Sequence, residues 1–210
     1  PYRETIAKLC SPEFAGRGYV EDGSALAAQF IAAEFHKIGL QPFKNKFEQS
    51  FTLPVQTFPG ACLFAVGSDT LKPGIDYLVH PGSAGISLPT NYQLVYCNVR
   101  TLYRSVNAFK PCPKDRMLVV QTSGFGGDTN KVLQTRLQEL QQFAATIELT
   151  SSKLTWSVSQ QAKPYPAFQV LLTAFANKPQ SALMHLTTLF EPKFTSSNVI
   201  GYLPAAQNAK

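Results

Sequence analysis

The chain has 210 residues, with 19 Lys and Arg against 13 Asp and Glu and a formal net charge of +6. Only 15% of the residues are charged and 44% are hydrophobic, which excludes disorder over most of the length, because disordered chains combine low hydrophobicity with high net charge. No apolar run reaches the roughly 18 to 20 residues of a membrane span, and Pro1–Glu4 lacks the features of a secretory signal. We therefore expect one large or two small folded domains without a membrane span.

The positive charge does not indicate a nucleic-acid partner. The cations are scattered, with small groups at Lys44 and Lys46 and at Lys110, Lys114 and Arg116. A phosphate-binding surface requires clustered Lys and Arg, so a plain solvated surface is the favoured interpretation.

The first predicted elements are a helix and a strand. Apolar residues recur at helical spacing from Ser24 to Ile38, with Ser24 as the expected cap and Gly39 as the left-handed residue that ends the helix. From Lys46 to Val55 apolar and polar residues alternate, which predicts a strand with one solvated face.

The next region of the sequence is predicted to be rich in β-strands. The chain contains 15 Pro, 13 Gly and 15 Phe, and turn signals recur at about ten-residue spacing from Phe58 to Pro113. This spacing favours a meander or small barrel over alternating β and α units. Short apolar runs lie at Ala61–Val66, Tyr77–Val79 and Gln93–Val99.

One β-α-β passage is predicted within this region. Its parts are a strand at Met117–Gln121, a glycine turn at Ser123–Gly127, a helix from Thr129 to Ala144 capped by Asp128 or Thr129, and a strand at Thr146–Thr150. Further strands are expected at Leu154–Val158, Phe168–Leu172, Leu183–Phe190 and Asn198–Leu203.

The glycine turn only partly matches the fingerprint of a nucleotide-binding site. Gly124 and Gly126 supply the first two glycines of G-x-G-x-x-G, but Thr129 stands at the third position. An acidic residue follows about twenty positions later, Glu148, yet it lies inside a strand pattern rather than at its end. A simple tight turn is therefore favoured over a cofactor site.

The sequence also misses the motif spacings of serine hydrolases and of metal sites. Gly82–Gly85 and the turn at Ser123 both miss the G-x-S-x-G spacing of a serine nucleophile. The three histidines, His36, His80 and His185, stand in no metal-binding spacing, and a structural role is expected for each.

The four cysteines include no C-x-x-C pair, which argues against a zinc knuckle or a thioredoxin-like motif. Both disulfides and buried free thiols remain open for them. They are Cys10, Cys62, Cys97 and Cys112.

Both ends of the chain carry specific motifs. Ser11–Arg17 reads SPEFAGR and is followed by the Ala-rich helix, Ile38–Pro42 (IGLQP) and Phe47–Phe51, while Thr195–Pro204 reads TSSNVIGYLP. In this order they resemble the zinc aminopeptidase family that includes aminopeptidase Y and the glutamate carboxypeptidases. The intervening residues resemble, more loosely, the protease-associated domain found inserted there in many members. The segments that carry this looser resemblance are Asp76–Tyr77, Ser83–Gly85, Met117–Gln121, the helix near Thr129 and Tyr165–Val170.

The resemblance implies an α+β fold with three segments. Residues 1–57 would be the N-terminal helix-strand segment of the peptidase core, and residues 58–194 a protease-associated β-rich domain, an open barrel or sandwich with a β-α-β passage. Residues 195–210 would hold the first strand of the catalytic domain.

The same resemblance implies where the chemistry lies. Family members hydrolyse peptides with two zinc ions, whose ligands begin at an H-x-D soon after N-V-I-G and continue through Asp, Glu and His, with a Glu as general base. Only Ala205–Lys210 follow Pro204. We therefore expect no catalytic, cofactor-binding or metal-ligating residue in this chain and no peptidase activity from it alone. The two zinc ions would belong to the missing catalytic domain.

The expected role is noncatalytic: shaping access to the active site of an exported zinc exopeptidase, in the extracytoplasmic space, or making partner contacts. The missing catalytic domain would be the main partner, and self-association through Ser24–Ile38 and Asn198–Leu203 is expected without it. Two alternatives stay open. The catalytic half could lie on a second polypeptide or in a longer coding region, or the chain could be a stand-alone module for peptide or glycan ligands that lost its catalytic domain.

Overall fold

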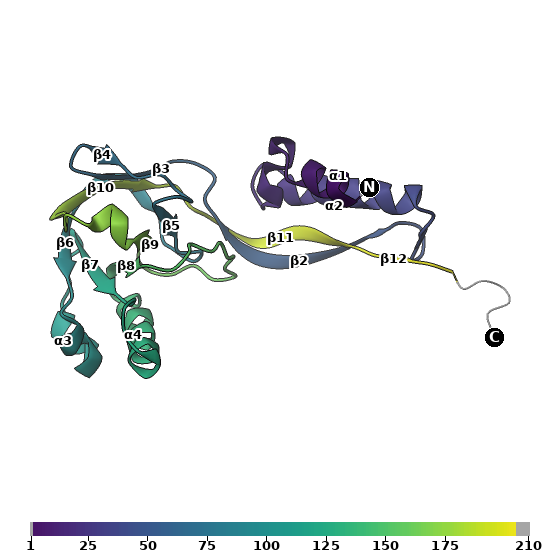
Figure 1. Ribbon diagram of the computed structural model, residues 1–210. Helices are drawn as coiled ribbons and strands as arrows, with labels where there is room; N and C mark the ends of the chain where they lie inside the picture. The colour runs from purple at the N-terminus through teal and green to yellow at the C-terminus, as the bar shows by residue number, and fades with distance from the viewer. Residues whose placement is uncertain (1, 205–210) are drawn as a thin grey trace. The chain divides into compact units, whose positions relative to one another are not determined.

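The computed structural model describes residues 2–204 (Figure 1). They form two compact units: unit 1 combines the residues up to Thr57 with those from Glu191 onward, and unit 2 is Phe58–Phe190. Unit 2 is thus inserted, in sequence, between two segments of unit 1. The part of the predicted segment 195–210 that follows Pro204 lies outside the described residues. Within residues 2–204, no helix combines the length and the apolar character needed to cross a membrane.

Unit 1 places helices against paired strands (Figure 1). Strand β2 pairs with β11, and the short β1 pairs with β12 in antiparallel register, with Gln41 opposite Tyr202. Its elements are α1 (Tyr2–Leu9), η1 (Pro12–Arg17), α2 (Gly23–Lys37), β1 (Gln41–Pro42), β2 (Glu48–Thr57), β11 (Leu189–Val199) and β12 (Gly201–Tyr202).

Aromatic pairs hold unit 1 together. The rings of Phe35 on α2 and Phe47 before β2 lie 5.9 Å apart, and those of Tyr19 and Phe194 lie 4.9 Å apart, both in edge geometry. Such pairs add about 0.5–1.5 kcal/mol beyond the area they bury. They attach the helical layer to both long strands of the unit.

The predicted helix 24–38 is α2, but its predicted cap is wrong. The helix begins at Gly23, preceded by Asp22 in the left-handed region at φ 55°, and the side chain of Ser24 does not cap it. A Cβ on Gly23 would lie 2.4 Å from the carbonyl oxygen of Phe14, so only glycine fits where α2 starts against η1. Gly39, at φ +82°, is confirmed as the left-handed residue after the helix.

Unit 2 is built on a curled eight-stranded sheet with the order β4-β3-β10-β6-β7-β8-β9-β5. Strands β6, β7, β8 and β9 are parallel neighbours, and the remaining pairs are antiparallel. The strands are β3 (Cys62–Val66), β4 (Asp69–Thr70), β5 (Tyr77–Val79), β6 (Ile86–Tyr96), β7 (Arg116–Gln121), β8 (Ala145–Thr150), β9 (Ala167–Leu171) and β10 (Ser181–Leu186). The helices are α3 (Val99–Arg104), η2 (Val106–Phe109), α4 (Gly127–Leu140) and η3 (Leu172–Phe175).

The predicted β-α-β passage is confirmed as β7-α4-β8, whereas the meander is wrong beyond β6. The chain leaves β6 through α3, whose N-cap Asn98 accepts a hydrogen bond from the backbone N–H of Thr101, and it returns as the parallel strand β7. The strand predicted at Gln93–Val99 therefore ends at Tyr96. Helix α4 starts after Gly126 rather than at a cap formed by Asp128 or Thr129.

Three other predicted strands differ from the structure, and the first, Asn198–Leu203, is divided at Ile200 between β11 and β12. Leu154–Val158 belongs to an irregular segment, in which its alternating residues Trp156 and Val158 are exposed and pair with no strand. Leu183–Phe190 is divided, because β10 ends at Leu186 and β11 begins at Leu189. In the intervening residues, the backbone N–H of Thr187 donates to the carbonyl of Ala61 at 2.8 Å.

The sheet of unit 2 buries both faces. On the first face, the fully buried ring of Phe64 lies 5.1 Å from that of Tyr77 and 5.3 Å from that of Phe168. On the second face, Leu133, Leu137 and Leu140 of α4 form a buried stripe against β7, as the helical spacing predicts. The first core unites strands from both ends of the sequence of unit 2.

Replacing Phe64 with Ala should remove three ring contacts at once and leave a cavity, because Phe175 also lies 6.0 Å from it. We expect a loss of about 3–5 kcal/mol in the free energy of unfolding, measured by urea denaturation. The matched control Leu88→Ala, at a side chain 73% exposed, should change it by less than about 0.5 kcal/mol. Equal losses in both variants would contradict the assignment of this core.

Candidate functional site

A row of three side chains crosses the second face of the sheet in unit 2. Glu148 on β8 is the register partner of Gln169 on β9, and Gln169 is the partner of Leu78 on β5. Because side chains alternate between faces, these three point away from the first core, to which Ile147 and Phe168 belong. Helix α4 packs over β7 and β8.

The row forms the floor of a pocket of about 190 Å³. Its walls include Gln141, just after α4, and His80, just after β5, while the irregular segment Thr155–Ser157 lies over it. We call this cavity the Glu148 pocket. Its lining residues are Leu78, Val79, His80, Pro81, Gln141, Glu148, Thr155, Trp156, Ser157, Phe168 and Gln169.

Three neutral donors hold the Glu148 carboxylate. Its Oε1 accepts hydrogen bonds from Thr122 Oγ1 at 2.6 Å and Gln134 Nε2 at 2.7 Å, and its Oε2 accepts one from Gln169 Nε2 at 3.2 Å. A carboxylate offers about four lone-pair sites, so the more lightly bonded Oε2 has capacity for a further donor. These three hydrogen bonds fix the side chain in position, and within residues 2–204 Glu148 takes part in none of the observed salt bridges.

His80 contributes a neutral imidazole. Its Nδ1 accepts a hydrogen bond from the backbone N–H of Gly82 at 3.1 Å, so the proton of the neutral ring sits on Nε2. Burial, together with the smaller effect of the positive charge on nearby Lys163, lowers the pKa of His80 to about 4. His80 is therefore a hydrogen-bond donor without charge near neutral pH.

Lys163 brings a positive charge close to the pocket without lining it. Its Nζ donates to Gln141 Oε1 at 2.6 Å, and burial lowers its pKa. The bond fixes the orientation of the Gln141 amide. The Glu148 pocket thus combines one carboxylate, one nearby ammonium group and several neutral donors and acceptors.

Trp156 forms the aromatic part of the pocket. It is the only tryptophan of the chain, and it is 64% exposed although it lines a cavity. Small-molecule sites typically combine such apolar or aromatic surface with a few convergent polar groups. The Glu148 pocket has both kinds of group in its lining.

The residues that the sequence analysis considered as site candidates lie in separate places. His36 lies in the last turn of α2 and His185 lies half-buried in β10, whereas His80 reaches the Glu148 pocket. Glu148 lies inside β8, as its strand pattern predicts. The glycine turn leads into α4, with Gly124 at φ +90°.

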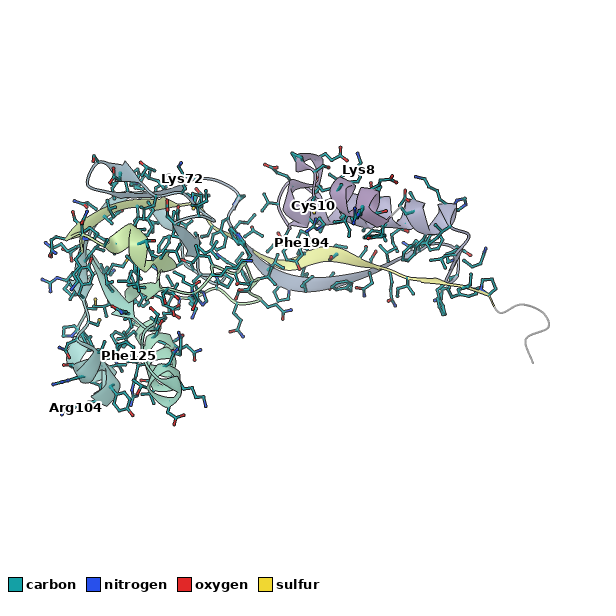
Figure 2. The ribbon with its side chains drawn as sticks, viewed as in Figure 1. Lys8, Cys10, Lys72, Arg104, Phe125 and Phe194 are labelled. Atoms are coloured by element: carbon teal, nitrogen blue, oxygen red, sulfur yellow. The ribbon has the colours of Figure 1, made fainter. Side chains whose placement is uncertain are left out.

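A second hollow, of about 300 Å³, lies beside this glycine turn. Arg100, Arg104 and Tyr103 of α3 line it with Phe125 and Thr129, and Figure 2 shows Arg104 and Phe125 at the helical side of unit 2. Both arginines are exposed. The hollow is a basic surface feature without a buried polar group of its own in its lining.

All four cysteines are free thiols in the described part of the chain. Burial raises the pKa of Cys97 to about 12, with a further contribution from Cys112. No group of three or more His, Cys, Asp and Glu side chains within residues 2–204 is arranged to hold a metal ion.

Unit 1 carries a different kind of surface. A groove of about 620 Å³, the terminal groove, is lined by residues 43–49 and Ile200. The backbone N–H of Ile200 donates to the carbonyl of Phe47 at 2.8 Å, and the exposed ring of Phe43 lies 5.4 Å from that of Tyr202. Leu203, 76% exposed, extends this apolar surface.

Searches with family models and against curated proteins found no match. Solved structures do match in fold. An aminopeptidase from Aneurinibacillus sp. strain AM-1 matches with 15% identity and a TM-score of 0.51, over 98% of this chain and 48% of that one. A zinc aminopeptidase from Bacillus subtilis matches with 16% identity and a TM-score of 0.56, over 90% of this chain and 43% of that one.

A peptidase M28 precursor from Shewanella amazonensis matches with 12% identity and a TM-score of 0.50, over 86% of this chain and 45% of that one. At such identities the likeness concerns the fold. The chain spans less than half the length of these three structures.

No site residue was predicted from the sequence, and the Glu148 pocket was not predicted either. One signal was present: an acidic residue within the apolar strand pattern Ala145–Thr150 of a chain that is only 15% charged. Buried charges require partners, so such a residue indicates a polar network. The partners themselves, Thr122, Gln134 and Gln169, could not be identified without the strand order.

The lowered pKa of His80 has a testable consequence. Its proton NMR shift should stay constant from pH 8 to pH 5 and move only near pH 4, with His80→Asn used for assignment. Replacing Lys163 with Met should raise this pKa, because a nearby positive charge is removed. Titration of His80 near pH 6.5 in the folded protein would contradict the described burial.

The lowered pKa of His80 also makes the stability of the folded protein depend on pH. Because the folded-state pKa lies below the ordinary value of about 6.5, the unfolded chain binds a proton at His80 between pH 6.5 and 4 that the folded chain does not. His80 should therefore make the protein less stable as the pH falls through this window.

Proposed function

We propose that this chain is the noncatalytic N-terminal and protease-associated portion of a zinc-dependent aminopeptidase-like peptidase, in which it shapes substrate access or partner contacts. The observation that carries the proposal is the uneven coverage of the fold matches. They extend over 86–99% of this chain but only 43–48% of the peptidases. A portion of a larger peptidase would give this pattern.

The proposal assigns a role to each part of the chain. Residues 1–57 are the helix-strand segment of the peptidase core, residues 58–194 are the protease-associated domain, and residues 195–210 begin the catalytic domain. The pairing of β2 with β11 supports this, because it joins core segments that flank unit 2 in sequence. The motifs at Ser11–Arg17 and Thr195–Pro204 lie in these flanking segments.

The surface of unit 1 supports a missing partner domain. Phe43, Tyr202 and Leu203 are exposed around the terminal groove, at the last described strand of the chain. Contiguous apolar surface on a folded protein commonly marks an interaction site. The occupant that we propose is the catalytic domain, whose chain would continue from β12.

Zinc and location follow the same proposal. In this proposal both zinc ions would be held by the catalytic domain, as the resemblance to the zinc aminopeptidases implies. When bound, zinc would supply an activated water and polarise the peptide carbonyl there. The parent peptidase would act in the extracytoplasmic space, by resemblance to exported members of the family.

The purified chain should show no hydrolysis of aminoacyl p-nitroanilides above the rate of buffer with zinc. The reason is that activation of water needs a bound metal and a base in one site. A zinc-dependent turnover that co-elutes with this chain and disappears with a chelator would contradict the proposal. Isothermal titration with zinc provides an independent readout, for which no tight binding of two ions per chain is expected.

The uncovered surface should also cause self-association when the chain is alone. We expect multi-angle light scattering to show dimers or larger species as the concentration increases, because apolar surface is removed from water. The double variant Ile200→Ser with Leu203→Ser should weaken association by about tenfold or more, from the loss of two buried side chains.

A matched control distinguishes association through this surface from nonspecific hydrophobic association. Ile75→Ser with Leu88→Ser removes two exposed apolar side chains of unit 2 and should leave the association unchanged. A monomer at all concentrations, with β12 protected from proteolysis, would oppose the assignment of the terminal groove as a docking surface.

A further inference from the structure

We propose that the Glu148 pocket of unit 2 is a binding site for one neutral sugar ring, either a free monosaccharide or the terminal unit of a glycan. The inference concerns a cavity that the peptidase proposal does not use. It rests on the charge, the hydrogen-bonding groups and the aromatic surface of the pocket, each of which restricts the class of ligand.

The charges favour a neutral ligand. Glu148 contributes a carboxylate to the lining, and Lys163 places an ammonium group behind Gln141, 2.6 Å from its Oε1. His80 is uncharged near neutral pH because its Nδ1 accepts from Gly82 in a buried setting. An anion would meet Glu148, and a cation would meet the field of Lys163, so neither sign of charge is clearly selected.

The polar groups favour hydroxyl partners. Glu148 Oε2 accepts a hydrogen bond from Gln169 and has lone-pair capacity for another, while His80 has an Nε2–H to donate. Thr155 and Ser157, in the segment over the pocket, can both donate and accept. A set of donors and acceptors within one small cavity suits hydroxyl groups, each of which is a donor and an acceptor at once.

The main acceptor is held in place before any ligand arrives. The two oxygens of Glu148 are bound by Thr122 just after β7, by Gln134 on α4 and by Gln169 on β9. A preorganised group loses little conformational entropy when it binds a ligand. The carboxylate can therefore contribute to affinity despite the weakness of a single hydroxyl contact.

The aromatic surface and the volume select a single ring. Trp156 lines the pocket and is 64% exposed, so much of its indole is open to a ligand. The C–H face of a pyranose is apolar and can pack on such a surface while its hydroxyls reach the polar floor. At about 190 Å³, the pocket is smaller than the roughly 300–1,000 Å³ of sites for drug-sized molecules.

A peptide ligand is less well supported by the same groups. Peptides commonly bind by adding a strand to an open sheet edge, where backbone groups of the protein supply the hydrogen bonds. Here the floor is a sheet face, on which Glu148 and Gln169 belong to strands already paired with each other. Glu148 and Gln169 therefore offer a ligand their side chains.

Trp156 provides the test, because the fluorescence of the chain's only tryptophan reports on the pocket directly. We would titrate the intact chain with glucose, galactose, mannose and N-acetylglucosamine, and in parallel with n-butylammonium, acetate and glycyl-leucinamide. At least one sugar should give a saturable change with a Kd on the order of millimolar, as expected for a small ligand with few contacts. Methyl glycosides separate the sources: equal binding indicates a glycan end, and loss of binding indicates a free reducing sugar.

Two variants and a control locate the binding. Glu148→Gln, followed by fluorescence, and Trp156→Ala, followed by calorimetry, should each weaken sugar binding by about tenfold, the equivalent of one lost hydrogen bond or aromatic contact. Asp69→Asn, which removes one exposed carboxylate of β4 in the same unit, should leave the Kd unchanged. If Glu148→Gln lacks a cooperative melt, Trp156→Ala decides, since an exposed side chain can be removed without disturbing the core.

Three outcomes would overturn the proposal: no sugar binding up to about 100 mM, binding that both pocket variants leave intact, or saturable binding of the amine or the peptide alone. None of them bears on the peptidase proposal, because the assay requires no catalytic domain and no zinc.

Discussion

The structure of unit 2 depends on one constraint, which is that the four parallel strands β6 to β9 within its mixed sheet must be covered on both faces. The first face is closed by the aromatic cluster around Phe64, which unites β3, β5 and β9. The second face has the helices α3 and α4 for cover, and they lie over β7 and its neighbours. The row from Glu148 to Leu78 is not covered by these helices. An irregular segment lies beside it instead, which leaves a pocket.

Polar groups in this pocket follow from the same constraint. A charged residue in the interior of a sheet is costly unless hydrogen bonds replace its hydration, and Glu148 has three. A fully apolar residue at this position would have packed under α4 without such partners. Unit 1 shows the opposite situation, since its apolar residues around the terminal groove are exposed to solvent. The two units thus present two different kinds of surface, one with more polar lining and the other mainly apolar.

The elements with strong local signals could be predicted from the sequence. The apolar periodicity of α2 and α4, the glycine after α2 and the strand pattern of β7 and β8 all depend on nearby residues, and the structure contains them. Helix α3 was missed because its six residues are too few for a periodic pattern. Leu154–Val158 alternates as a strand does, yet no neighbouring strand is placed to pair with it. The pocket was beyond prediction, because His80, Gln141 and Glu148 meet only through the order of β5, β9 and β8.

Our central proposal is that this chain is the leading portion of a zinc peptidase, whose catalytic domain would follow it in sequence and pack against the apolar surface at β12. The reading frame of the messenger RNA beyond the codon for Lys210 tests it most directly. The account predicts that translation continues, with an H-x-D segment soon after and further Asp, Glu and His ligands downstream. A stop codon shortly after Lys210, in a protein that remains monomeric and stable, would contradict it.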